Sequence, residues 1–219
     1  MFLHTHPYPP FIPEFATKLI VGTLPPPRFT TGDLKEGDVD FCYGSRDGQL
    51  WPILNTIFDL DLKFETTREA IAQRKNFLKD RGIGICDIVE SAGREKVDAS
   101  DLGMQQVVLR DILEVLRVNS RIDTLLFTGG NSKNGPEYFF RQLLKREGLS
   151  LKIISSEVPR IHELRLPDSN RIITTVSLTA PSGAANRAVG SLQRYKEMKA
   201  LDPKLTTIDF RIAQYKPFF

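Results

Sequence analysis

Residues 18–25 read KLIVGTLP, a short apolar and β-branched run that is followed at once by glycine and proline. A run of this kind, bounded by turn residues, predicts a buried β-strand. Its apolar residues are continuous rather than alternating, which is typical of a parallel sheet covered on both faces. In such sheets ligands bind beyond the carboxyl ends of the strands, so the loop that begins at Gly22 is a candidate for function.

Comparable runs recur along the chain at 82–86, 124–127 and 172–176, with 151–154 as a fifth candidate. Helical patterns lie between or after them, at 49–58, 66–80, 105–118, 136–146 and 184–200. Strands that alternate with helices imply a parallel sheet with helices on both faces. We therefore expect an α/β fold over residues 1–219: one three-layer α/β/α domain whose central, mainly parallel sheet has four or five strands.

The two ends are expected to differ in behaviour. Residues 1–17 are predicted to form a mobile N-terminal arm that carries His4 and His6. Residues 205–219 are predicted to pack on the domain, because an exposed aromatic tail would be adhesive. The start lacks the basic and apolar regions of a signal peptide, and no apolar stretch approaches the ~20 residues of a membrane helix. Two cysteines without metal spacing favour a reducing compartment. We expect a cytoplasmic monomer without membrane, metal, cofactor or obligatory protein partner.

The formal net charge of +3 permits a polyanionic partner without demanding one. Residues 184–219 hold seven basic and three acidic side chains, whereas residues 1–47 hold four basic and six acidic ones. The C-terminal third is therefore the better candidate for contact with phosphates. A solvated helix face explains the same pattern equally well. The acidic residues between Asp33 and Asp40 would repel a phosphate backbone and favour another substrate slightly.

Candidate functional residues follow the predicted strands. Tyr43 lies on a long loop, where it either stacks on a base or packs the loop down. Asp87 ends a buried strand, so its carboxylate needs a partner: a ligand N–H, the next turn, or Arg94. Asn131 belongs to a glycine-rich turn that presents backbone N–H groups before a helix. Ser182 precedes the last helix, either close to a phosphate backbone or as an ordinary helix cap.

In their order and placement these segments resemble the uracil-DNA-glycosylase superfamily, nearest its hypoxanthine-DNA-glycosylase-like branch. Gly22-Thr23-Leu24-Pro25 is similar to the first motif, Gly-x-Asn/Asp-Pro, and residues 43–51 are similar to Tyr-Ala-x-x-x-Asn-x-Phe-Trp. Residues 82–101 resemble the stretch that delivers a base-reading Asn or Asp. Ala180-Pro181-Ser182 resembles the last motif, a Pro-Ser loop that presses on the DNA strand.

The resemblance implies a monofunctional DNA N-glycosylase, a hydrolase that needs no cofactor. Water would cleave the bond between deoxyribose and a deaminated or modified base that has been rotated out of DNA. The residues implied to bind the base are Gly22, Thr23, Leu24, Tyr43, Asp87 and Asn131. The residues implied to contact DNA are Arg46, Ser182, Gly183, Asn186 and Arg187.

The chain departs from the family at the positions that orient the water, where it has Leu24 and Gly48. Asp47 is the nearest substitute, so Asp47 and Asp87 are the predicted catalytic residues. An Asp at position 87 accepts from a base N–H but repels a carbonyl oxygen, which favours hypoxanthine or another modified base over uracil. The alternative is a catalytically inactive or repurposed member that binds DNA, RNA or a nucleoside without excising a base.

Overall fold

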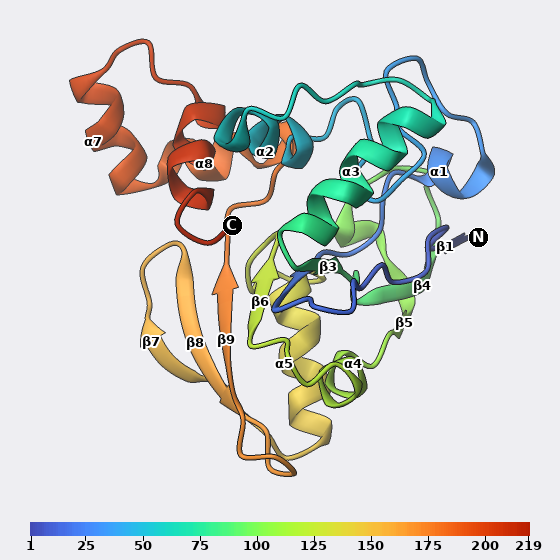
Figure 1. Cartoon of the computed structure of the whole chain (residues 1–219), viewed down its shortest axis with the longest axis vertical. Coiled ribbons are helices and arrows are strands. Elements are labelled where there is room, and N and C mark those ends of the chain that lie inside the picture. The colour runs from blue at the N-terminus through green and yellow to red at the C-terminus, as the bar shows by residue number, and fades with distance from the viewer.

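A six-stranded sheet forms the centre of the molecule in the computed structural model, which describes residues 1–219 (Figure 1). Its strands lie in the order β3 (Ile83–Ile85), β2 (Lys18–Val21), β6 (Thr124–Phe127), β9 (Ile172–Ser177), β8 (Arg160–Arg165) and β7 (Lys152–Ser155). The first four are parallel to one another, and β8 and β7 continue the sheet in antiparallel fashion. The parallel strands therefore end at one common edge.

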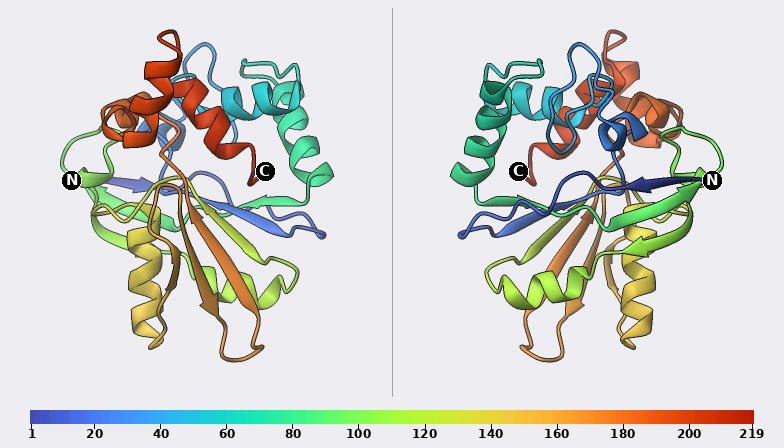
Figure 2. Two further views of the ribbon diagram at one scale, coloured as in Figure 1. Left: turned by 90° about the vertical axis from the view of Figure 1, so that its left-hand side faces the viewer. Right: turned by 90° about the vertical axis from the view of Figure 1, so that its right-hand side faces the viewer.

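Helices cover both faces of this sheet, so the predicted single-domain α/β/α architecture is confirmed (Figure 2). On one face lie α2 (Leu50–Phe58), α3 (Arg68–Asp80) and α8 (Thr207–Tyr215), and on the other α4 (Ile112–Val118) and α5 (Pro136–Arg146). Strand β2 shows why its apolar run is continuous. Leu19 and Val21 pack into the core beneath α4 and α5, whereas Ile20 packs into the core beneath α2 and α3.

The sheet has one strand more than the expected maximum because β8 was not predicted. Its sequence, RIHELR, alternates polar and apolar residues instead of forming an apolar run. The structure buries His162 and Leu164 from this strand, at 2% and 1% exposure, while its other side chains are less buried. A strand buried on one face lacks the signal by which the other strands were found.

A second sheet corrects two further expectations. It consists of β1 (Phe2–Thr5), β4 (Val89–Arg94) and β5 (Gln105–Leu109), paired antiparallel in that order. Residues 1–17 are therefore not a mobile arm, since β1 is paired along its length. The predicted helix at 105–118 is also wrong in its first part, because it begins only at Ile112, where the side chain of Asp111 accepts from the backbone N–H of Glu114.

The C-terminal part consists of short elements. Residues expected to form one helix at 184–200 are divided into η2 (Gly183–Ala185), α6 (Asn186–Ser191) and α7 (Gln193–Leu201), with extended backbone at Leu192. Helix α7 buries no residue and projects from the body of the molecule (Figure 1). Helix α8 packs beside α2, and its Tyr215 stacks on Phe219. None of the helices combines the length and apolar character required to cross a membrane.

Candidate functional site

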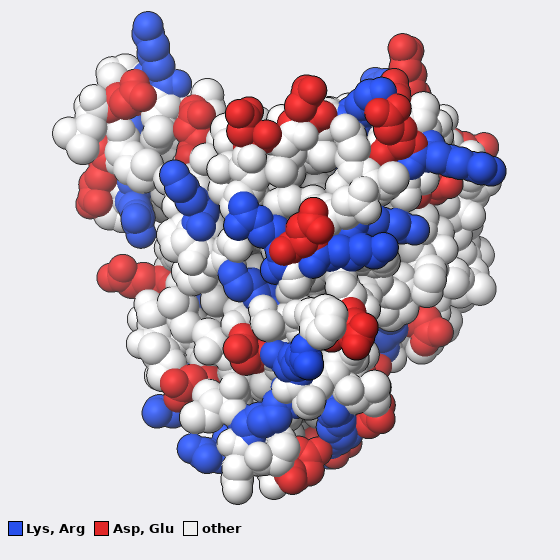
Figure 3. Space-filling view, in the orientation of Figure 1, with Lys and Arg blue, Asp and Glu red and all other residues white.

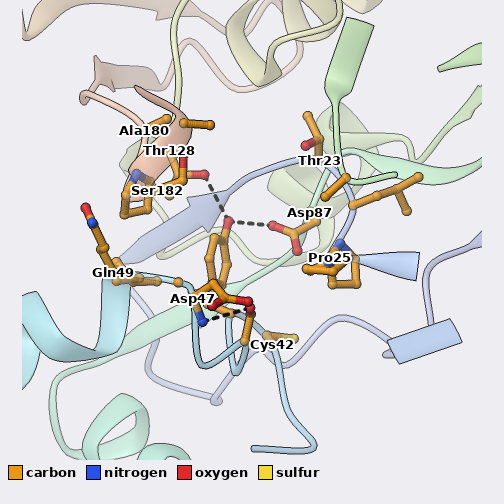
Figure 4. A pocket seen from close by; sticks show the side chains of 18 of the residues that line it. Thr23, Pro25, Cys42, Asp47, Gln49, Asp87, Thr128, Ala180 and Ser182 are labelled. Atoms are coloured by element: carbon orange, nitrogen blue, oxygen red, sulfur yellow. Dashed lines mark hydrogen bonds between the residues drawn. The ribbon is translucent and has the colours of Figure 1, made fainter. Parts of the chain in front are cut away.

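A pocket of about 430 Å³ lies at the carboxyl ends of the parallel strands. The loops after β2, β3, β6 and β9 supply its walls, together with residues before α2 and the segment after β1 (Figure 4). This volume is in the range of small-molecule sites. Seven of the predicted site residues line it: Thr23, Leu24, Tyr43, Asp47, Asp87, Ser182 and Gly183.

Asp87 is the centre of a buried hydrogen-bond network in this pocket. Its side chain is 7% exposed, and its Oδ1 accepts from the Tyr43 hydroxyl and from the backbone N–H of Gly22, both at 2.7 Å. The Tyr43 hydroxyl also lies 3.1 Å from the hydroxyl of Thr128, as the dashed lines in Figure 4 show. Burial, followed by the charge of Asp87, raises the pKa of Tyr43 well above its ordinary value. Tyr43 therefore acts as a donor here.

The third partner of Asp87 is His6, whose Nε2 lies 2.9 Å from Oδ2. His6 was expected on a mobile arm, but strand β1 and the backbone bond from its N–H to the carbonyl of Glu90 hold it beside the pocket. Nothing in the local sequence indicates this contact, because 81 residues separate the two side chains. A carboxylate with three internal donors is compensated for its burial and keeps about one lone-pair direction for a ligand.

Two backbone features make this network possible. Tyr43 has a left-handed backbone with φ of 57°, which costs an ordinary residue roughly 1–2 kcal/mol. Such strain is kept where the surrounding contacts fix a side chain for function. Gly22 leaves room for the network, since a Cβ there would lie 2.2 Å from the Tyr43 hydroxyl and 2.9 Å from Oδ1 of Asp87.

Asp47, the predicted catalytic carboxylate, lies at the mouth of the pocket. Its side chain is 70% exposed, with oxygens 3.4 Å from a guanidinium nitrogen of Arg28 and 4.0 Å from one of Arg46. Arg28 is itself held by Asp38, which is buried. Although burial opposes ionisation, hydrogen bonds from Arg28 and two backbone N–H groups hold the pKa of Asp38 at about 2. Asp38 is thus ionised, but the positive charge of Arg28 offsets its charge, so this residue of the acidic loop does not repel phosphate.

Asp101 is a carboxylate of the pocket that was not predicted as a site residue. It lies at the start of η1 (Asp101–Gly103) and accepts a hydrogen bond from the Thr23 hydroxyl at 2.8 Å. Burial raises the pKa of Asp101 to about 6. No local pattern in the sequence indicates this burial, since Asp101 lies in a polar stretch with Asp98 and Ser100.

Other predicted contacts lie elsewhere. Asn131 is exposed and outside the pocket, whereas Asn134 of the same turn is buried and donates to the carbonyls of Asp101 and Met104. Asn186 is half-buried, and its side-chain oxygen accepts from Arg211 and Thr207. Arg46 and Arg187 are exposed and outside the pocket lining, and the Ser182 side chain makes no capping bond. Arg187 and Ser182 are therefore free to contact a ligand.

Apolar and amide groups complete the walls. Leu24, Pro25 and Leu50 offer flat apolar surface, and the buried side-chain oxygen of Gln49 has no hydrogen-bond partner within the protein. Figure 4 shows Gln49 and Thr23 on opposite sides of the pocket. The pocket thus combines apolar side chains with the polar network around Asp87.

No group of three or more His, Cys, Asp or Glu side chains is placed to bind a metal ion. Comparison with protein-family models, with curated proteins and with solved structures finds no match to this chain. The function therefore has to be argued from the geometry of the site.

Proposed function

We propose that this protein is a monofunctional DNA N-glycosylase that binds a flipped-out deaminated or modified base and hydrolyses its N-glycosidic bond. The observation that carries the proposal is the buried Asp87. Tyr43, Gly22 and His6 hold its carboxylate in place in a pocket that is large enough for a nucleobase. An oriented carboxylate between apolar walls suits a flat heterocycle with an N–H at its edge.

The chemistry of Asp87 favours one kind of base. Three protein donors already occupy its oxygens, and a ligand N–H can use the direction that remains. A carbonyl oxygen at the same place would meet a negative charge. The edge N–H of uracil lies between two carbonyl oxygens, whereas that of hypoxanthine lies between one carbonyl oxygen and a C–H. The charge of Asp87 therefore repels the edge of uracil more, and hypoxanthine or another modified base is preferred.

Contact with DNA would come from the surface next to the pocket. Gly183 and Ala184 line its mouth, and the elements that follow carry the exposed basic residues Arg187, Arg194 and Lys196. Acidic and basic side chains are mixed over much of the face seen in Figure 3. Few net phosphate contacts are therefore expected, with a modest dependence of affinity on salt. We further propose that the protein acts as a cytoplasmic monomer.

The test is release of the free base from oligonucleotides that carry hypoxanthine, xanthine, uracil or an alkylated base, in single and double strands. We expect release of one purine-type base and a strong loss of release in Asp87→Ala. Tyr138→Phe, a change outside the pocket, is the control. Release of uracil as fast as hypoxanthine would refute the role of Asp87 in selecting the base. No release from any substrate would refute the proposed glycosylase activity.

The second candidate function is binding without cleavage. It is favoured by the state of Asp47, which is exposed and paired with Arg28 and Arg46 instead of pointing at a buried reaction centre. Leu24 also brings no polar group to the pocket. Tight binding of a modified oligonucleotide, with a measurable salt dependence and no product after prolonged incubation, would establish this function instead.

A further inference from the structure

Asp101 stands where two cavities meet. The base pocket is adjoined by a second cavity of about 280 Å³, lined by the glycine-rich turn after β6, the end of β9 and helix α6. Four residues belong to the walls of both cavities: Thr23, Asp101, Thr128 and Ala180. A ligand larger than a base would extend from one cavity into the other and pass Asp101. Of the four shared residues, Asp101 alone is ionisable.

The carboxylate of Asp101 is held firmly at this position. Oδ1 accepts from the Thr23 hydroxyl at 2.8 Å, and Thr23 follows β2 at the carboxyl edge of the sheet. The backbone carbonyl of Asp101 accepts from the side-chain amide of Asn134 at 2.9 Å and from the N–H of Met104. Oδ2 receives no hydrogen bond from the protein and is available to a water molecule.

Groups on three parts of the fold determine how readily Asp101 ionises. Burial disfavours the charged form, whereas the Thr23 hydroxyl and the guanidinium of Arg94 on β4 favour it, and the negative charge of Asp87 after β3 opposes it. The outcome is a pKa of about 6 for Asp101, above the usual range of an aspartate. A carboxylate of this kind is still ionised at neutral pH and accepts a proton more readily than a solvated one.

We infer that Asp101, rather than Asp47, is the residue that orients and deprotonates the attacking water in this pocket. The inference rests on the proposed function, because it names the missing catalytic group of the same site. Asp47 is adjacent in sequence to Gly48 but its side chain is exposed, whereas Asp101 lines both cavities and accepts a hydrogen bond from Thr23.

The oxygen of a water bound to Oδ2 forms a bond to C1′ of the sugar, and Asp101 takes one of the water protons. The bond between C1′ and the base nitrogen breaks, and its electron pair leaves with the base. Asp101 then gives its proton to the departing base anion, directly or through solvent, so that the products are the abasic sugar with a hydroxyl at C1′ and the neutral base. Asp87 does not exchange a proton in this step.

The experiment compares single-turnover base release and oligonucleotide affinity in wild type, Asp101→Asn and Asp47→Asn. Asp80→Asn is the matched control, since Asp80 is an exposed carboxylate outside all the cavities described. We expect Asp101→Asn to lower the rate by about 10²–10⁴-fold with affinity changed less than about threefold. Circular dichroism would check that each variant is folded.

The dependence of the rate on pH distinguishes a catalytic role of Asp101 from a structural one. A residue with a purely structural role would not set the pH at which the rate changes. The wild-type rate should fall below an inflection near pH 6, the pKa of Asp101. The Thr23 hydroxyl lowers that pKa, so Thr23→Val should move the inflection to higher pH. In Asp101→Asn the acidic limb should disappear.

Each outcome separates the inference from the function on which it rests. Base release that survives in Asp101→Asn, or is lost only in Asp47→Asn, would overturn the role of Asp101 and leave the glycosylase intact. A wild-type inflection near pH 4 that Thr23→Val does not move would also overturn it. Absence of release from every substrate in wild type, with DNA still bound, would overturn the proposed function and the inference with it.

Discussion

Replacing Tyr43 by Phe tests the central network of the pocket. The change removes one hydroxyl, keeps the ring, and leaves Asp87 with two of its three donors. A hydrogen bond to a charged group contributes about 1.5–3 kcal/mol. Because the lost hydroxyl borders the pocket, water can enter and replace part of that bond. We therefore expect a loss of about 2 kcal/mol in the free energy of unfolding, roughly 30-fold in the unfolding constant.

The assay is equilibrium unfolding in urea at pH 7, supported by calorimetry. A loss of about 2 kcal/mol lowers Tm by roughly 4–8 °C in a domain of this size. Tyr195→Phe is the matched control, because its hydroxyl makes no hydrogen bond within the protein. A double-mutant cycle with Asp87→Asn, which keeps an acceptor oxygen but removes the charge, isolates the charge-dependent part of the bond and should show a coupling energy of about 1–2 kcal/mol.

Tyr43→Phe with a free energy of unfolding within about 0.5 kcal/mol of wild type, or zero coupling to Asp87, would refute this role of the hydroxyl. Either result would mean that the bond of 2.7 Å between the Tyr43 hydroxyl and Asp87 does not offset the burial of the carboxylate. The left-handed backbone of Tyr43 would then need another explanation.

Three further predictions concern the surroundings of the pocket. Burial lowers the pKa of the fully buried His4 to about 4, so the folded state binds fewer protons than the unfolded one between pH 6.5 and 4. The His4 contribution should lower stability by about 3 kcal/mol as the pH falls through this range, whereas Asp101, whose pKa is raised to about 6, acts in the opposite direction. Urea unfolding at several pH values should therefore show a difference between wild type and His4→Asn that grows by about 3 kcal/mol from pH 6.5 to pH 4. Gly22→Ala should weaken base binding at least tenfold by fluorescence titration, because its Cβ would lie 2.2 Å from the Tyr43 hydroxyl. Arg211→Lys should cost about 3 kcal/mol in urea unfolding and weaken base binding, since the buried guanidinium holds the carbonyls of Ala180 and Ser182.

Each of these has its own control. A difference in stability between wild type and His4→Asn that does not change with pH would assign the loss at low pH to another group, such as His162, whose pKa burial also lowers. Gly190→Ala is the control, because its Cβ would lie in open space outside both cavities, so it should bind like wild type. Unchanged binding in Arg211→Lys would show that the loop at 180–182 keeps its position without the guanidinium.

The parallel part of the fold could be predicted from the sequence because its signal is local. Strand β2 is apolar on both faces, and any chain that contains such a strand must cover it with two layers. The same pattern fixes where the strand ends, and hence that Gly22, Thr23 and Asp87 lie at the ligand-binding edge. Strands with a weak local signal, such as β1 and β8, could not be found in this way.

The same distinction between local signals and long-range contacts applies to the functional site. Sequence pattern alone determined that the loops after the strands would meet, because parallel strands deliver their carboxyl ends to one edge. Only the tertiary structure decided which side chains meet within that pocket. His6 reaches Asp87 through the pairing of β1 with β4, and Thr23 reaches Asp101 across 78 residues. Burial, which sets the proton affinity of Asp101 and leaves Asp47 in solvent, is a property of the packed chain and has no local signature in the sequence.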